Sequence, residues 1–196
     1  MAKLLIASRN PGKIKSFKDY LSDLKLNIVS LNDLNLPDEM AEDGTTFEEN
    51  SLKKAMYWGD KTGFLTVGDD GGLEIPALGG EPGVKSRRWP GFEASDEELI
   101  DYTLEKIKPL SRDQREARLS AVITLYDPKS GEYHQEKSEI NGILLDKPRV
   151  YQPGFPFRSI FYLPDIGKTF GELSDEEVGR LYLHRKKAVE KLKKYL

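Results

Sequence analysis

The sequence predicts an α/β protein with a long central sheet. Residues 3–31 have the pattern of a strand, a helix and a second strand. Two later segments rich in β-forming residues, 117–126 and 132–140, flank the turn sequence Asp-Pro-Lys-Ser-Gly and predict a hairpin. Strands and helices mixed in this order are typical of an α/β protein.

The elements of the first half follow from apolar spacing and capping patterns. Lys3 to Ala7 and Asn27 to Leu31 predict strands, and the helix between them has its apolar residues at helical spacing: Ile14, Phe17, Leu21 and Leu24. Thr45 and Thr46 each precede a glutamate by three residues, as in a capping box, which predicts a helix from there to about Trp58.

Two short strands, 64–68 and 73–75, are predicted on either side of Asp69-Asp70-Gly71-Gly72. Glycines and prolines predict a long loop over 79–90. Ser95 and Glu98 form another capping box, before a helix with one apolar face: Leu99, Ile100, Thr103, Leu104 and Ile107.

The chain is expected to end in a strand over 160–163 and a basic helix that runs from Arg185 to the C-terminus. No internal repeat, low-complexity tract or linker divides the sequence, so residues 1–196 are expected to form one domain.

Composition excludes several classes of protein. The 196 residues carry 30 basic and 33 acidic side chains, a formal net charge of -3, which argues against a general nucleic-acid binder. The absence of cysteine excludes disulfides, thiolate metal sites and a cysteine nucleophile. The first apolar run is too short for a signal peptide or a membrane span, so a soluble cytoplasmic protein without membrane association is expected.

Four segments have the composition of a phosphate and metal site. The first, Ser8 to Lys13, joins a strand to a helix, and a helix N-terminus attracts anions. It lacks the Walker A pattern, and an ordinary turn with a solvated lysine is the alternative. The second, Glu42 to Asn50, gathers carboxylates of the kind that bind magnesium, and a capped acidic helix start, which charge alone favours, is the alternative.

The third segment places two aspartates, Asp69 and Asp70, at the end of an apolar strand. Repulsion and desolvation both oppose this arrangement, and a divalent cation relieves both. One carboxylate could then ligate the metal or accept a proton from water. A hairpin turn is the alternative, because Asp-Gly favours one. The fourth is His184-Arg185, which could donate hydrogen bonds to a base carbonyl or form a surface pair at a helix start.

These segments, in this order, resemble blocks of the inosine triphosphate pyrophosphatase family, which acts on non-canonical purine nucleoside triphosphates. The matching blocks are LLIASRNPGKIKSF, EDGTTFEENSLKKA, VGDDGGLEIPALGGEPGVKSRR, and TFGEL with the later LHRKKAV. The resemblance implies a long central mixed sheet flanked by helices, with two lobes around a deep cleft. It implies magnesium-dependent cleavage of a nucleoside triphosphate to a monophosphate and pyrophosphate, in a nucleotide-cleansing homodimer.

The resemblance also implies a role for each matching residue. Asp70 would be proton acceptor and magnesium ligand, with Glu42 as second ligand and Lys54 and Asp69 as further catalytic residues. The implied substrate-binding residues are Ser8, Asn10, Lys13, Asn50, Gly71, Ser86, Arg88, Phe155, Phe157, Arg158, His184 and Arg185.

Departures from the family pattern gather around the base-reading positions. Gly71 replaces a serine, Phe157 a tyrosine and Arg158 an aspartate, while a family lysine aligns with Gly179. Phe155, the residue expected to stack on the base, is retained. Because such changes alter the discrimination between bases, the sequence predicts an active pyrophosphatase with altered base preference. The alternative is a nucleotide-binding or sensing protein with weak catalysis.

Overall fold

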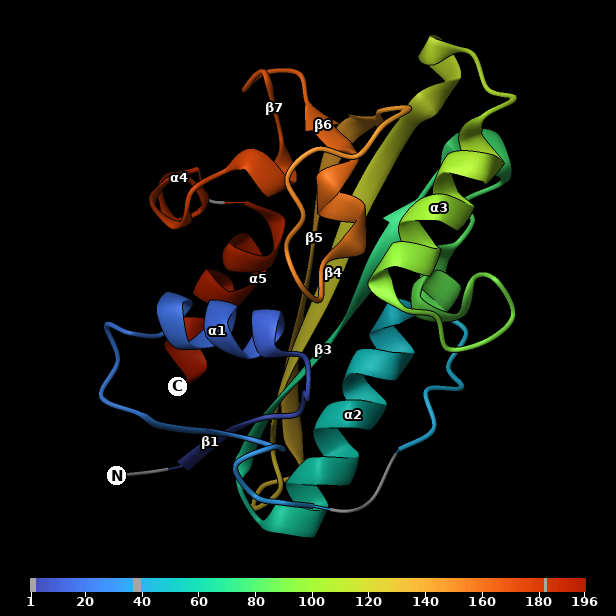
Figure 1. Cartoon of the computed structure of the whole chain (residues 1–196). Coiled ribbons are helices and arrows are strands. Elements are labelled where there is room, and N and C mark those ends of the chain that lie inside the picture. Colours follow the sequence, from blue (N-terminus) through green and yellow to red (C-terminus); the bar gives the residue numbers. More distant parts are fainter. Residues whose placement is uncertain (1–2, 37–39, 182) are drawn as a thin grey trace. The chain divides into compact units, whose positions relative to one another are not determined.

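In the computed structural model, residues 3–36, 40–181 and 183–196 are described. Seven strands form one hydrogen-bonded sheet in the order β2-β1-β3-β4-β5-β6-β7. Their bounds are β1 Lys3–Ile6, β2 Asn27–Ser30, β3 Leu65–Glu74, β4 Glu116–Asp127, β5 Glu132–Leu144, β6 Phe161–Leu163 and β7 Lys168–Thr169. β1 is parallel to β2 and β3, whereas β6 is antiparallel to β5 and β7. The predicted mixed sheet is confirmed (Figure 1).

The α-helices are α1 Pro11–Tyr20, α2 Phe47–Thr62, α3 Asp96–Ile107, α4 Asp175–Arg180 and α5 His184–Leu192. Short 3-10 helices are η1 Pro76–Leu78, η2 Gly83–Arg88, η3 Arg112–Arg115, η4 Pro156–Ser159, η5 Phe170–Glu172 and η6 Lys193–Tyr195. The chain forms two compact units, each assembled from separate stretches: Met1–Asp70, Ala121–Ser138 and His184–Leu196 in unit 1, and Gly71–Ser120 and Glu139–Leu183 in unit 2.

Unit 1 has helices on both faces of its strands. In β1, Leu4 and Ile6 join a core cluster with α1 and α5, whereas Leu5 joins a second cluster with Trp58 of α2. Alternate side chains of a strand face opposite sides, so both faces of β1 must be apolar. This requirement explains why the opening run lacks the polar alternation of a half-exposed strand.

α1 is shorter than its apolar spacing predicts. Asn10 caps it, and Ile14, Phe17 and Tyr20 form its buried face, but the helix ends at Tyr20. Leu21 and Leu24 therefore follow the helix, although Leu21 is still fully buried. Apolar residues in a turn that packs on the same core extend a helical pattern beyond the helix itself.

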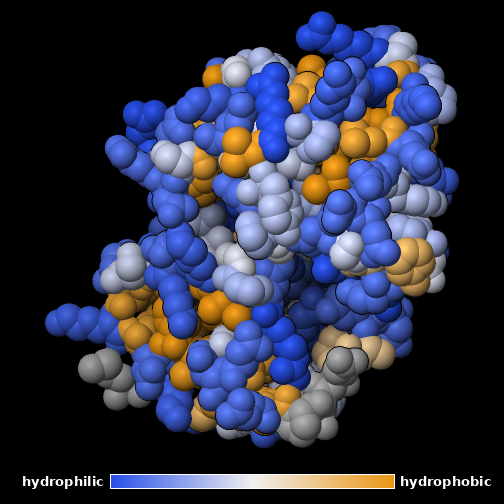
Figure 2. Space-filling view, viewed as in Figure 1, coloured by the Kyte–Doolittle hydropathy of each residue, from blue (hydrophilic) through white to orange (hydrophobic). Residues whose placement is uncertain are grey.

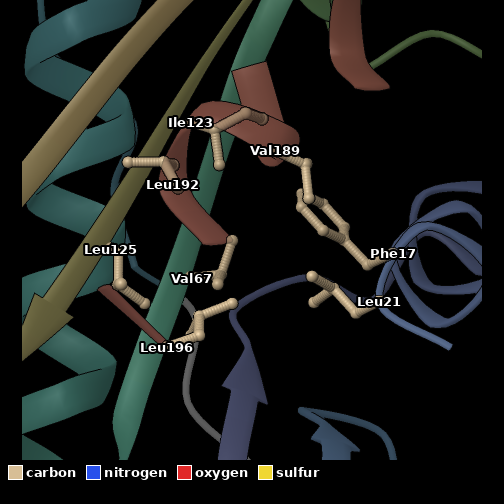
Figure 3. A pocket seen from close by; sticks show the side chains of 8 residues that line it. All are labelled: Phe17, Leu21, Val67, Ile123, Leu125, Val189, Leu192 and Leu196. Carbon is tan, nitrogen blue, oxygen red and sulfur yellow. The ribbon is translucent and has the colours of Figure 1, made fainter. Parts of the chain in front are cut away.

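α1 and α5 lie side by side although the whole chain separates them (Figure 1). Between them and the sheet is a small apolar cavity of about 10 Å³, enough for one water molecule at most. Figure 3 shows the side chains around it, which come from both helices, the strands and the C-terminal Leu196.

α2 begins and ends on clear backbone signals. Thr46 caps its N-terminus by accepting a hydrogen bond from the Glu49 amide, and Gly63 ends it with a left-handed φ of 69°. The helix reaches Thr62, one turn beyond the predicted Trp58.

The prediction of two strands around Asp69-Asp70-Gly71-Gly72 is wrong, because β3 is one strand of ten residues. Within an extended strand, the two aspartates face opposite sides and each meets its own cations, so no turn is needed to separate their charges. Gly72 has no side chain because a Cβ there would collide with the Ser86 side chain and the Gly83 carbonyl.

Unit 2 packs α3 and the 3-10 helices η1 to η5 on the remaining strand segments. The Ser95–Glu98 capping box is present, and the predicted apolar face contributes Leu99, Ile100, Thr103 and Ile107 to the core. The expected long loop over 79–90 contains η2, and β4 and β5 extend beyond their predicted ends. The final helix starts at His184 and gives way to η6, so it does not continue to the C-terminus as predicted.

Hydrophilic side chains predominate on the face seen in Figure 2, with hydrophobic ones in separate patches. Among the described residues, no helix has both the length and the apolar character needed to cross a membrane.

Candidate active site

The turn from β1 into α1 presents a capped helix N-terminus. The Asn10 side-chain oxygen accepts hydrogen bonds from the amides of Gly12 and Lys13, at 2.8 and 3.2 Å. The Ser8 hydroxyl accepts one from the Asn10 amide at 3.1 Å. Within this structure, Ser8 and Asn10 therefore shape the turn, and their role toward a triphosphate stays a prediction.

Lys13 extends from this turn to β3. Its Nζ donates to Asp69 Oδ1 at 2.7 Å and lies 3.4 Å from the Asp69 carbonyl oxygen. The alternative interpretation of this segment, an ordinary turn with a solvated lysine, is therefore wrong. Arg185, at the start of α5, binds the other oxygen of the same carboxylate, with Nε 2.6 Å from Oδ2.

The Asp69 carboxylate is thus buried between two cations. Burial alone would raise the pKa of Asp69, but the charges of Arg185 and Lys13 outweigh it and hold that pKa well below its usual range. Burial would likewise lower the pKa of Arg185, and the Asp69 charge more than offsets this effect. Asp69 is therefore a fixed anion, unsuited to exchange protons at neutral pH.

Asp70 lies in a different environment, beside α2. Lys54 Nζ is 3.6 Å from Asp70 Oδ1 and 3.0 Å from Glu42 Oε1, and it donates to the Asp69 carbonyl oxygen at 3.1 Å. Burial raises the pKa of Asp70, and the neighbouring charges of Lys54 and Lys13 offset this only in part. Lys54 stays protonated, because Asp70 and Glu42 raise its pKa by more than burial lowers it.

Asn50 connects the segment before α2 to this cluster. Its side-chain oxygen accepts a hydrogen bond from the Gly44 amide at 2.8 Å, and its side chain also hydrogen-bonds to Asp70. Asn50 is 1% exposed, so its hydrogen-bonded side-chain amide is held in one position. It holds residues 42–44 on α2 and so places Glu42 near Lys54.

The remaining acidic residues of the second segment belong to the helix start. Glu49 accepts hydrogen bonds from the Thr45 amide and hydroxyl, at 2.6 and 2.9 Å. Asp43 pairs with Lys53 on the surface at 2.9 Å. For Asp43 and Glu49 the capped-helix interpretation holds. Glu42 differs from them, because its carboxylate and that of Asp70 both lie within ion-pair distance of Lys54 Nζ.

The fit of a magnesium ion depends on Glu42 and Asp70. Among the described residues, no group of three or more acidic, histidine or cysteine side chains is placed to hold a metal. However, Asp70 Oδ2 is buried and has no hydrogen-bond partner. Magnesium commonly uses one or two carboxylates and takes its other ligands from phosphates and water. The two carboxylates therefore fit a metal that arrives with its substrate.

His184 and Arg185 are 4% and 6% exposed, so the alternative interpretation as a surface pair is wrong. Arg185 uses Nε and Nη2 toward Asp69, at 2.6 and 3.4 Å. Its part in reading a base stays a prediction, and its place beside Asp69 was not foreseen from the sequence.

In unit 2, Ser86 ties η2 to β3. Its hydroxyl accepts from the Leu73 amide at 3.0 Å and donates to the Gly83 carbonyl at 2.7 Å. These bonds give Ser86 a structural role, and its predicted contact with substrate is untested. Arg88 is exposed at the end of η2, and Gly71 directly follows Asp70 in β3.

The segment expected to read the base contains a buried arginine. The Arg158 guanidinium lies 3.6 Å from the Phe155 ring centroid and 4.2 Å from that of Phe170, and its Nη1 donates to Gln152 at 2.9 Å. Phe157 points into the core of unit 2. The three residues predicted for this segment thus have different surroundings. Arg158 stacks on Phe155, whereas Phe157 is part of the core.

Asp96 connects distant segments of unit 2, a role that was not predicted from the sequence. Its carboxylate accepts from Arg87, from the Tyr151 hydroxyl at 2.7 Å and from the Gly154 amide at 2.7 Å. Asp96 therefore joins η2 to the segment that leads into Phe155. The only sequence signal was its position after a capping serine, which points to a helix start and not to these distant partners.

Comparison with known proteins identifies relatives over nearly the whole chain. The model of the Ham1 family matches residues 4–195. A "dITP/XTP pyrophosphatase" of Thermus thermophilus is 41% identical over 192 residues, which are 97% of this chain and 89% of the relative.

Two solved structures have the same fold. A HAM1 protein from Coxiella burnetii has a TM-score of 0.84 and 31% identity, with 98% of this chain and 96% of the other covered. The Staphylococcus aureus Ham1 protein has a TM-score of 0.82 and 33% identity, with 98% and 97% covered.

Proposed function

The chain belongs to the Ham1 family, and we propose that it hydrolyses dITP and XTP to the nucleoside monophosphates and pyrophosphate. The name of the Thermus thermophilus relative supports this choice of substrate. One observation in the structure supports the chemistry: a buried carboxylate, Asp70, has a raised pKa and lies beside a charged lysine, Lys54. The same arrangement supplies a proton acceptor and a cation for phosphate.

The proposed roles follow from charge and position. Water attacks the α-phosphorus, the bond from that phosphorus to the oxygen bridging the α- and β-phosphates breaks, and pyrophosphate leaves with that oxygen. Asp70 takes the proton of that water, since a raised pKa makes a carboxylate a better base near neutral pH. Lys54 and Lys13 stabilise the charge that builds on the phosphate oxygens.

Glu42 and Asp70 are the residues that would hold magnesium. When bound, magnesium supplies positive charge that offsets the charge of the triphosphate. Asp69 would have a different task, because its low pKa keeps it an anion that orients Lys13 and Arg185.

The test is release of pyrophosphate and monophosphate from a panel of nucleoside triphosphates with magnesium. dITP, ITP and XTP should be hydrolysed far faster than the four canonical deoxynucleotides. No turnover of any of them would overturn the proposal. Calorimetry that detects tight binding without hydrolysis would instead select a nucleotide-binding or sensing protein.

A second candidate concerns base preference, and its supporting observation is the stack of Arg158 on Phe155. If Phe155 stacks on the base, a buried positive charge behind its ring favours an anionic or electron-rich base. We therefore propose that xanthine, which loses a proton more readily than hypoxanthine, is preferred. Arg158→Met should lower the ratio of XTP to dITP turnover, and an unchanged ratio would refute the candidate.

Three coarser properties complete the proposal. We propose one functional domain, since the family match covers residues 4–195. A homodimer in the cytoplasm is proposed from the family resemblance alone. Light scattering of the purified chain tests the dimer, and a monomer mass at micromolar concentration would contradict it.

A further inference from the structure

A series of hydrogen bonds, buried except at Gln135, runs from β5 through β4 to α2 and β3, all within unit 1. Gln135 Nε2 donates to Thr124 Oγ1 at 2.7 Å, and Thr124 and Ser51 share a hydrogen bond at 2.8 Å. The Ser51 hydroxyl donates to the Gly68 carbonyl oxygen at 3.1 Å. Ser51 and Thr124 are both 0% exposed, so water does not compete for the bond between them or for the bond from Ser51 to Gly68.

The number of available protons fixes which atom donates in each hydrogen bond of this series. Ser51 has one hydroxyl proton, which goes to Gly68, because a carbonyl oxygen only accepts. Thr124 must then donate to Ser51, and its own oxygen accepts from Gln135. The Gln135 amide nitrogen also donates to the Glu48 carbonyl at 3.0 Å, which fixes the orientation of the amide group.

The same region has an unusually close approach of helix and strand. A Cβ at Gly68 would come closer than 3.0 Å to the Ser51 carbonyl oxygen and the Ala55 nitrogen. The α2 backbone therefore rests directly on β3, with no side chain between them. With backbone against backbone, no flexible side chain can adjust if α2 moves relative to β3. The hydrogen bonds beside this contact therefore set the position of α2.

These contacts lie one helical turn from the proposed catalytic lysine. Ser51 precedes Lys54 on α2 by three positions, a spacing that places the two on one helix face. Gly68 directly precedes Asp69 and Asp70 in β3. The chain of hydrogen bonds thus fixes the two elements that bring Lys54 Nζ to 3.6 Å from Asp70 and 3.1 Å from the Asp69 carbonyl.

We propose that Thr124 and Ser51 are positioning residues, which hold α2 on β3 so that Lys54 faces Asp70. The inference rests on the proposed function for its effect on turnover, and on geometry alone for its effect on Lys54. Neither hydroxyl touches the reacting groups. A misplacement of about 1 Å can lower turnover about 100-fold, because the transition state tolerates displacement poorly.

Thr124→Val removes the hydroxyl and keeps the shape of the side chain, whereas Thr124→Ser keeps the hydroxyl. We expect the valine variant to lose at least tenfold in kcat with less than a twofold change in KM, and the serine variant to recover most of the kcat. Ser51→Ala removes the hydroxyl that α2 contributes to the same hydrogen bonds. It serves if the valine variant fails to fold, because alanine favours helix.

A readout independent of catalysis is the rate of Lys54 acetylation, followed by peptide mass spectrometry. Lys54 is 8% exposed, so a shift of α2 should speed its modification several-fold in Thr124→Val and Ser51→Ala. Thr124→Ser should match the wild type. The acetylation rate tests the positioning role of Thr124 and Ser51 even if the protein hydrolyses no nucleotide. An absence of hydrolysis would overturn the proposed function and leave this inference standing.

Thr103→Val is the matched control. Thr103 is 0% exposed and donates to the Leu99 carbonyl at 2.6 Å, but it lies on α3 in unit 2. This variant should lose thermal stability while its kcat and Lys54 acetylation stay unchanged. The inference is overturned if Thr124→Val and Ser51→Ala keep wild-type Lys54 acetylation, or if Thr103→Val changes kcat and Lys54 acetylation as much as Thr124→Val does.

Discussion

Asp69 and Asp70 are adjacent in β3, yet their pKa values shift in opposite directions. Asp69 meets Lys13 and Arg185 on the side of α1 and α5, and Asp70 meets Lys54 on the side of α2. Both carboxylates are buried, so the difference comes from the closeness of their cations. One strand thus carries, at successive positions, a carboxylate with a lowered pKa and one with a raised pKa, the second being the proposed proton acceptor.

Asp70→Asn should abolish turnover and leave the protein as stable as the wild type or more so. The pKa of Asp70 is raised by burial, so its ionised form disfavours the folded state above the ordinary aspartate pKa, and a neutral amide removes that penalty. We expect kcat to fall about 100-fold or more. Pyrophosphate release and urea unfolding at pH 7 measure the two effects, and near-normal kcat would refute the role given to Asp70.

Asp69→Asn should destabilise the fold by about 3–5 kcal/mol at pH 7, because it leaves Arg185 buried without its counter-charge. The pKa of Asp69 is lowered on folding, so its contribution is complete above about pH 4 and is lost only as the pH falls further. Urea unfolding of both proteins from pH 8 to pH 3 tests this window. A difference that already shrinks between pH 7 and pH 5 would show that Asp69 titrates in its usual range or above it.

Asp96→Asn should loosen the segment that leads into Phe155. The Arg87 and Tyr151 hydrogen bonds lower the pKa of Asp96 against the opposing effect of burial, so the carboxylate stabilises the fold at neutral pH. We expect a loss of about 1–3 kcal/mol and a higher KM for nucleotides. Tyr151→Phe, which removes one of these bonds, should lose less. Equal unfolding curves for wild type and Asp96→Asn would contradict the prediction.

Leu192→Ala should destabilise unit 1 by about 2–5 kcal/mol, since Leu192 lines the existing apolar cavity between α5 and the sheet (Figure 3). Val150→Ala, at a side chain that is 52% exposed, is the control and should change stability by about 0.5 kcal/mol at most. Thermal unfolding measures both variants. A similar loss in the two would mean that burial at Leu192 contributes little.

The elements that local patterns specify agree closely with the structure. The Ser95 capping box starts α3, Thr46 starts α2, and the apolar run at Lys3 gives β1. Each signal lies within a few residues of the element it starts, so neighbouring residues suffice to read it. The break expected at Asp69-Asp70 was wrong because β3 continues through both residues, and the cations of α1, α2 and α5 that meet the two carboxylates lie outside the reach of a local turn preference.

The sequence by itself determined the family and the α/β class, because those are properties of residue types in order. Of the predicted site residues, the structure brings together Lys13, Glu42, Lys54, Asp69, Asp70 and Arg185. Only the tertiary structure decided which cations each of the two aspartates meets. Arg185 lies 116 positions after Asp69, and Thr124 lies 73 after Ser51, so no local rule links either pair. The nearness of the cations then separates the pKa values of the two buried aspartates, since charge interactions are strong where water is excluded.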